Sequence, residues 1–140
     1  MLEKALILAA KAHTGQVDKG GAPYILHPIR VMLACEGEKE KIVALLHDTL
    51  EDTALTAADL RRAGFPEEIV QAVCCLTRGQ KEDYMDYIAR ICENALAARV
   101  KYADLQDNLD ISRIPNPTEK DFARIRKYEQ AMKRITRSIK

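Results

Sequence analysis

A histidine and three carboxylates follow one another at the end of an apolar run that spans residues 42–53. These charged groups are His47, Asp48, Glu51 and Asp52. On a helix with roughly 100° per residue, all four fall within an arc of about 140° and share one face. The apolar residues just before them point all round the helix axis, so the segment is predicted to be buried. Because burying these groups together is costly without a positive partner, the stretch indicates a metal-dependent site.

A second cluster of acidic and amide residues lies on the helix predicted at residues 95–107 and just after it. Asp104 sits among apolar residues, and Asp107 and Asn108 follow at positions i+3 and i+4, on the same side. Histidine and carboxylate ligands from separated segments suit manganese, iron or zinc. Solvated helix ends are the alternative interpretation, and His27 taken alone is compatible with a satisfied core histidine. His13 is interpreted as an ordinary helix-end residue.

Helical spacing of apolar residues recurs along the chain, and no alternating run of strand length has convincing turn signals. Helices are predicted at residues 2–13, 28–36, 38–50, 57–63, 66–76, 84–91, 95–107 and 118–140. These elements predict an all-α fold of about seven or eight helices, with residues 1–140 as a single domain. A polar loop from Thr14 to Pro23 is expected at the surface, where it is long enough to touch a ligand.

The bulk composition excludes several partners. The 140 residues include 22 Lys+Arg and 21 Asp+Glu, a net charge of +1, so neither nucleic acid nor a membrane is an expected partner. No run of about 18 apolar residues occurs and the chain begins in a helical pattern, which predicts a soluble cytoplasmic protein. The four cysteines lack paired C-x-x-C spacing and are predicted to be buried free thiols. The sequence leaves the oligomeric state open.

Four motif blocks follow one another along the chain. They are A-H-T-G-Q at 12–16, P-Y-I-L-H-P-I at 23–29, A-L-L-H-D-T-L-E-D-T at 44–53 and V-K-Y-A-D-L-Q-D-N-L at 100–109. In this order they resemble the hydrolase domain of the Rel/Spo-type alarmone enzymes, within the HD phosphohydrolase superfamily named for its His-Asp doublet. The resemblance implies a helical HD domain, a divalent metal that is usually manganese, and a role in the stringent response.

The resemblance also implies roles for individual residues. The implied metal ligands are His27, His47, Asp48 and Asp104. Glu51 and Asp52 correspond to the pair thought to orient or activate the attacking water, and Asn108 to the family's nucleotide-contacting Asn. The chemistry fits independently, because a divalent ion lowers the pKa of bound water and a nearby carboxylate takes up the proton. An acidic helix end facing solvent is the alternative for Glu51 and Asp52.

Two positions depart from the family pattern. The family's loop before Pro-Tyr carries an Arg-Lys pair whose Arg lies against the guanine base, and the corresponding residues here are Asp18 and Lys19. A carboxylate cannot replace a planar cation, so this departure bears on the substrate. Lys19 is a candidate phosphate contact or, alternatively, a solvated loop lysine. Asp107 replaces a usual His and adds negative charge near the metal. Basic residues available to balance it are Arg78, Lys81, Arg113, Arg124, Arg126 and Lys127.

We therefore predict a metal-dependent hydrolase that removes the 3′-pyrophosphate of guanosine 3′,5′-bis(diphosphate), (p)ppGpp, to give GDP or GTP and pyrophosphate. Manganese is the expected ion, with iron or zinc as alternatives. The chain is expected to resemble the small stand-alone hydrolases, without the synthetase and regulatory domains of long family members. One rival hypothesis keeps the site but changes the substrate to another nucleotide or phosphorylated metabolite. The other is a non-catalytic nucleotide-binding module, against which the complete set of predicted metal and catalytic residues argues.

Overall fold

The computed structural model describes residues 1–139, which form nine α-helices and one short 3-10 helix. In chain order they are α1 (Leu2–Ala12), α2 (Leu26–Ala34), α3 (Glu38–Leu46), α4 (Thr49–Asp52), α5 (Ala57–Arg62), α6 (Glu67–Cys75), α7 (Tyr84–Ile91), α8 (Ala95–Asn108), η1 (Ile111–Arg113) and α9 (Glu119–Ile139). The β structure within these residues is a single antiparallel bridge between Val17 and Pro23. The predicted all-α class is confirmed.

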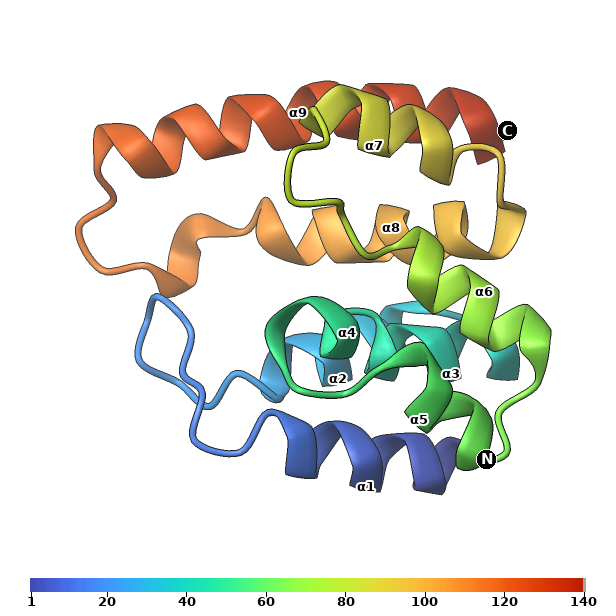
Figure 1. The fold of residues 1–140 in the computed structure, drawn as a ribbon. Coiled ribbons are helices and arrows are strands. Elements are labelled where there is room, and N and C mark those ends of the chain that lie inside the picture. The colour runs from blue at the N-terminus through green and yellow to red at the C-terminus, as the bar shows by residue number, and fades with distance from the viewer. Residues whose placement is uncertain (140) are drawn as a thin grey trace.

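The helices stack in layers, with α3 near the centre. α3 packs against α1, α2 and α8, and α9 packs on α8. Figure 1 shows this order from α1 at the bottom, through α2 and α3, to α8 and then α7 and α9 at the top. The residues from Ile42 to Leu46 are all buried, as predicted for this apolar run. The helix that leads into the His-Asp doublet is therefore surrounded by other helices.

The third predicted helix is interrupted at His47 and Asp48, which corrects the expectation of one continuous helix. α3 ends one residue before the doublet and α4 begins at Thr49. The ring Nδ1–H of His47 donates to the carbonyl of Ala44 at 2.5 Å, and the Thr49 hydroxyl donates to the carbonyl of Leu46 at 2.7 Å. These side chains satisfy carbonyls that a continuing helix would pair with backbone N–H groups. The carboxylates of α4 therefore lie on a separate short element.

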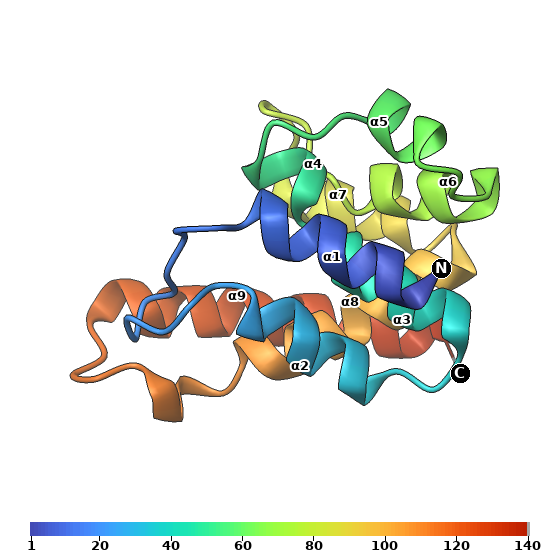
Figure 2. The same ribbon diagram turned by 90° about the horizontal axis from the view of Figure 1, so that it is seen from below.

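The loop between α1 and α2 is fixed by its own backbone. Asp18 Oδ1 accepts hydrogen bonds from the backbone N–H groups of Gly20 and Ala22, both at 2.9 Å, and closes a compact turn. Gly20 lies so close to the carbonyl of Arg113 that a Cβ atom would collide with it. Figure 1 shows this loop below the η1 segment, and Figure 2 shows it extending to the same side of the molecule as the start of α9. The loop is thus held against the segment that follows α8.

Two predictions from composition concern membranes and cysteines. No helix among residues 1–139 is both long and apolar enough to cross a membrane. All four cysteines are free thiols, as predicted. Cys35 is buried, whereas Cys74, Cys75 and Cys92 are half-buried rather than fully buried.

Candidate metal centre

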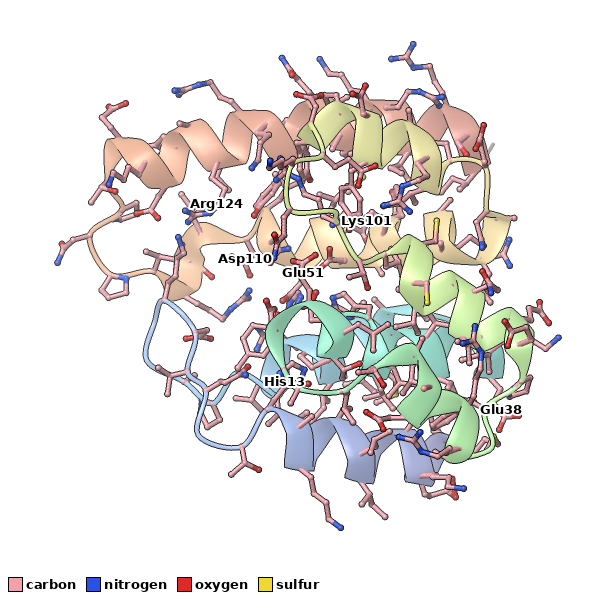
Figure 3. The ribbon with its side chains drawn as sticks, in the orientation of Figure 1. His13, Glu38, Glu51, Lys101, Asp110 and Arg124 are labelled. Atoms are coloured by element: carbon pink, nitrogen blue, oxygen red, sulfur yellow. The ribbon has the colours of Figure 1, made fainter. Side chains whose placement is uncertain are left out.

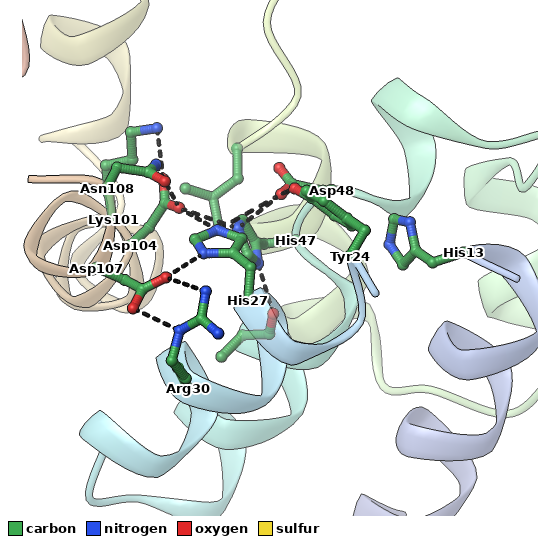
Figure 4. Close-up of polar contacts among 12 residues, drawn as sticks. His13, Tyr24, His27, Arg30, His47, Asp48, Lys101, Asp104, Asp107 and Asn108 are labelled. Atoms are coloured by element: carbon green, nitrogen blue, oxygen red, sulfur yellow. Dashed lines mark hydrogen bonds and ion pairs between the residues drawn. The ribbon is translucent and has the colours of Figure 1, made fainter. Parts of the chain in front are cut away.

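Three predicted ligands from three parts of the chain converge in the interior. His27 lies in the first turn of α2, His47 directly after α3, and Asp104 in the middle of α8, and all three are buried. One donor atom from each lies within 4.8 Å of the other two. Asp104 Oδ1 is 2.8 Å from His27 Nε2 and 3.3 Å from His47 Nε2. Figure 4 shows both rings turned toward this carboxylate.

The separations match the spacing of ligands around one divalent ion. Two ligands that each lie about 2.1 Å from a metal are roughly 3.0 Å apart at right angles and roughly 3.4 Å apart at tetrahedral angles. Imidazole nitrogen with carboxylate oxygen is a donor set that zinc, iron and manganese accept. The residues therefore fit a divalent metal by both chemistry and spacing.

Asp48, the fourth predicted ligand, lies beside this cluster. Its Oδ2 is 3.1 Å from His47 Nε2 and 3.8 Å from His27 Nε2. The Tyr24 hydroxyl donates a hydrogen bond to the same oxygen and orients the carboxylate. Burial raises the pKa of Asp48, but the neighbouring His47 outweighs this and lowers it below the usual value. The carboxylate is thus ionised and directed at the two rings.

Each imidazole is oriented by a hydrogen bond on its far side. His47 Nδ1 is bonded to the carbonyl of Ala44, and His27 Nδ1 lies 2.7 Å from Asp107 Oδ2. The Ala44 carbonyl and the Asp107 carboxylate each accept a hydrogen bond from the Nδ1–H of the neighbouring ring. In the neutral form of each ring the Nε2 lone pair therefore points at the cluster. This arrangement is typical of metal-binding histidines.

The negative charge of Asp107 is balanced by two neighbouring arginines. Arg30 donates to both of its oxygens, at 2.8 and 3.1 Å, and Arg113 lies 3.4 Å away. Burial raises the pKa of Asp107, but the hydrogen bonds from His27 and Arg30 hold it well below the usual value. Of the basic residues considered from the sequence, Arg113 contributes to this balance, and Arg30 was not among them.

The pKa values of the two rings reflect the carboxylates around them. Burial lowers the pKa of His27, but its hydrogen bonds with Asp104 and Asp107 outweigh burial and raise it. Burial also lowers the pKa of His47, yet Asp48 and Asp104 raise it well above the usual value. The carboxylates therefore attract positive charge to this point, and a cation binding here would exchange with protons on the rings.

The two predicted catalytic carboxylates line a cavity of about 280 Å³ beside the cluster. Glu51 and Asp52 are both exposed, and Glu51 Oε1 accepts a hydrogen bond from the backbone N–H of Arg78 at 2.8 Å. Although Asp52 is exposed as a residue, its carboxyl group is partly enclosed; this partial burial, followed by the charges of Asp48 and Glu51, raises the pKa of Asp52. His27 and Asp104 line the same cavity, so these carboxylates and two members of the candidate metal cluster border one space.

A second cavity, of about 400 Å³, opens on the other side of His27. The two cavities share the side chains of Tyr24, His27, Asn108 and Tyr128. Asn108 donates to Asp104 Oδ1 at 3.1 Å. Lys19 lines the larger cavity with its side chain mostly exposed, and its ammonium lies 4.0 Å from Asp121. The loop and the candidate centre therefore border two adjacent cavities that meet at these four shared side chains.

Sequence reasoning missed several residues that support the site. Lys101, one turn before Asp104, is buried and donates to Asp104 Oδ2 at 2.8 Å. Tyr24 lies within the 23–29 block that contains His27, and Arg30 directly follows that block, so their proximity along the chain was an available signal. His13, interpreted as an ordinary helix-end residue, is buried and packs its ring 4.9 Å from that of Tyr24. Figure 3 shows His13 below Glu51 and Lys101 above it.

Helices that bring a His-Asp doublet, a preceding His and a distant Asp to one point define the HD class of phosphohydrolase domain. Comparison with known proteins supports this class and identifies the family within it. The chain carries an HD-type hydrolase domain of the Rel/Spo kind. No protein-family model matches the chain.

Two bacterial proteins and one animal protein illustrate the similarity. The chain is 32% identical over 120 residues to guanosine-3′,5′-bis(diphosphate) 3′-pyrophosphohydrolase of Aquifex aeolicus and 31% identical over 124 residues to bifunctional (p)ppGpp synthase/hydrolase SpoT of Escherichia coli. Each match covers 77% of this chain and 17% of the relative. A solved structure, described as a metazoan ortholog of SpoT that hydrolyses ppGpp and plays a role in starvation responses, matches with a TM-score of 0.77 and 26% identity. That match covers 99% of this chain and 85% of the other.

Proposed function

We propose that the chain hydrolyses the 3′-pyrophosphate of (p)ppGpp in a metal-dependent reaction that releases GDP or GTP and pyrophosphate. The observation that carries this proposal is the donor cluster of His27, His47 and Asp104 beside a cavity lined by Glu51 and Asp52. The names of the relatives support the same substrate class, as does the description of the metazoan protein.

In this proposal a single ion is bound by four side chains, which are His27, His47, Asp48 and Asp104. Manganese is the proposed ion, and iron or zinc would suit the same donors. A divalent ion there supplies two effects when bound: it lowers the pKa of a water and polarises a phosphoryl oxygen.

The two carboxylates of α4 orient and deprotonate the attacking water. Asp52 accepts its proton, because a raised pKa makes this carboxylate a stronger base than an ordinary aspartate. Glu51 orients the water, held by the backbone N–H of Arg78. The new bond joins the water oxygen to the phosphorus next to the ribose, and the bond to O3′ breaks. O3′ gains a proton and leaves as the ribose hydroxyl.

The nucleoside occupies the larger cavity, where Asn108 and Lys19 are the proposed contacts. Asn108 reaches both cavities and is suited to seat the ribose between them. Lys19 lies on the loop that borders the opening and is suited to a phosphate. As further parts of the proposal, residues 1–140 act as one domain, in the cytoplasm.

A second candidate is hydrolysis of another nucleotide or phosphorylated metabolite at the same site. It is favoured by Asp18, whose carboxylate is used in the loop turn and offers no planar cation to stack on guanine. A manganese-supplemented screen over (p)ppGpp and ordinary nucleotides separates the two candidates if phosphate and pyrophosphate are measured separately. Pyrophosphate from (p)ppGpp alone supports the first candidate, and phosphate from simple nucleotides supports the second.

Two substitutions test the division of roles. Asp48→Ala should lose both bound metal and turnover, whereas Glu51→Gln should keep the metal and lose turnover by about 10²–10⁴-fold. Metal content is measured by elemental analysis and turnover by product release. Full activity in the Asp48→Ala protein would contradict the assignment of Asp48 as a metal ligand.

A further inference from the structure

Two cations from distant parts of the chain converge on one aromatic ring at the edge of the smaller cavity. The guanidinium carbon of Arg78, between α6 and α7, lies 5.4 Å from the ring centre of Tyr84, and the ammonium of Lys127, on α9, lies 4.4 Å from it. All three side chains line the 280 Å³ cavity. We call them the cationic wall.

The charges of this wall are not neutralised. Within residues 1–139, neither Arg78 nor Lys127 has a carboxylate within 4.0 Å. By contrast, other basic residues near the site each form an ion pair with a carboxylate: Arg30, Lys101 and Arg124. Arg78 uses its Nε–H on the backbone carbonyl of Glu82, which leaves its terminal nitrogens without a protein acceptor there. Burial, followed by the positive charge of Arg78, lowers the pKa of Lys127. The wall therefore carries excess positive charge.

The Tyr84 hydroxyl is a third group without a partner. It is buried and has no hydrogen-bond partner among the described residues. Burial raises the pKa of Tyr84 to about 12, so the hydroxyl remains a neutral donor. A buried hydroxyl without an acceptor is uncommon, because it loses hydration without compensation.

Carboxylates line the same cavity. They are Asp48, Glu51, Asp52 and Asp104. The cavity therefore holds the carboxylates of the proposed water and metal sites together with two cations that have no carboxylate partner among residues 1–139. Lys101 also lines the cavity, but its ammonium is paired with Asp104.

We propose that Arg78, Lys127 and the Tyr84 hydroxyl bind the outer phosphate of a 3′-diphosphate, the phosphate farther from the ribose. This inference rests on the proposed function and assigns the residues that recognise the outer phosphate of its substrate. The inner phosphate lies at the metal-binding atoms, and the outer phosphate extends across the smaller cavity. Charge-assisted hydrogen bonds from a guanidinium, an ammonium and a phenol suit a phosphate oxygen.

The test compares Lys127→Met with Lys133→Met, a matched loss of one lysine from the exposed face of α9. Binding of inorganic pyrophosphate and of inorganic phosphate to the metal-loaded protein is measured by calorimetry. Lys127→Met should weaken pyrophosphate binding about tenfold or more, and Lys133→Met by less than about twofold. Tyr84→Phe, which removes only the hydroxyl, should weaken it by a smaller factor while metal content stays unchanged.

A kinetic arm uses two substrates that differ only in the outer phosphate, guanosine 5′-diphosphate 3′-diphosphate and guanosine 5′-diphosphate 3′-monophosphate. Lys127→Met should lower the ratio of kcat/KM for the first over the second by about tenfold. Equal effects of Lys127→Met and Lys133→Met on pyrophosphate binding would overturn the inference. So would a wild-type protein that binds phosphate as tightly as pyrophosphate.

The binding arm also separates this inference from the proposed function. If (p)ppGpp is not hydrolysed but pyrophosphate binding still depends on Lys127, the proposed substrate is wrong and the diphosphate site stands. If (p)ppGpp is hydrolysed and pyrophosphate binding ignores Lys127, the proposed function stands and the cationic wall has no role in it.

Discussion

The histidine in the first turn of α2 is held by a carboxylate that the family pattern does not contain. His27 and Asp107 are 80 residues apart, and their side chains meet at 2.7 Å. Arg30, on the outer side, fixes the orientation of the same carboxylate with two hydrogen bonds. Asp107 is therefore interpreted as a positioning residue for a proposed metal ligand, rather than as a source of repulsion.

Asp107→Asn tests this interpretation. The amide removes the negative charge that makes His27 a better ligand, so metal affinity should fall about 10–100-fold. Affinity for manganese is measured by titration followed by electron paramagnetic resonance. Asp110→Asn is the control, because Asp110 pairs with Arg113 but has no bond to His27. Unchanged manganese affinity in Asp107→Asn, with normal helix content, would show that the contact is only structural.

At the scale of elements, the site depends on short segments that break regular structure. The interruption between α3 and α4 separates His47, a proposed ligand, from the carboxylates of α4, and the loop before α2 borders the larger cavity. Gly20 is the tightest point of that loop, because its α-carbon faces the carbonyl of Arg113.

Gly20→Ala should displace this loop or strain it. A Cβ atom there collides with backbone, which cannot rotate away as a side chain can, and overpacking of this kind costs about 1–3 kcal/mol. We expect a lower free energy of unfolding and a KM raised several-fold, with kcat less affected. Denaturant unfolding and steady-state kinetics measure both.

The matched control is Gly37→Ala at the start of α3. There a Cβ would meet only the flexible side chain of Glu40, at 3.7 Å or more, and the free energy of unfolding should change by less than about 1 kcal/mol. Equal behaviour of the two variants would mean that the loop accommodates the extra atom.

At the scale of the whole molecule, the proposed metal site ties α2, the end of α3 and α8 together. These three elements form much of the central packing, and their donor atoms meet in the interior. Repulsion among the carboxylates there is relieved by a bound cation, so metal binding and folding should be coupled.

Manganese at 100 times its Kd should raise the free energy of unfolding by about 2.7 kcal/mol, if the unfolded chain does not bind it. Differential scanning calorimetry should show a higher Tm with metal and a return to the lower value with a chelator. Asp48→Ala should lose most of this increase. An increase of the same size in that variant would place the binding elsewhere in the molecule.

The sequence by itself determined the helical class and the identity of the chemical groups. Helical spacing located the buried run before His47, and the ordered blocks singled out His27, Asp48 and Asp104 as partners. These signals are local or carried by order along the chain, so they can be detected without coordinates. The same local signals predicted one helix through His47, because hydrogen bonds from side chains to the carbonyls of α3 leave no periodic trace.

Only the tertiary structure decided how distant side chains pair. The bond between His27 and Asp107 and the contact of Lys127 with the ring of Tyr84 each join segments that are separated by tens of residues. Such contacts depend on the packing of α8 and α9 against the rest of the molecule. The sequence could name the basic residues, but their positions relative to the cavity follow from three-dimensional packing, which local periodicity does not encode.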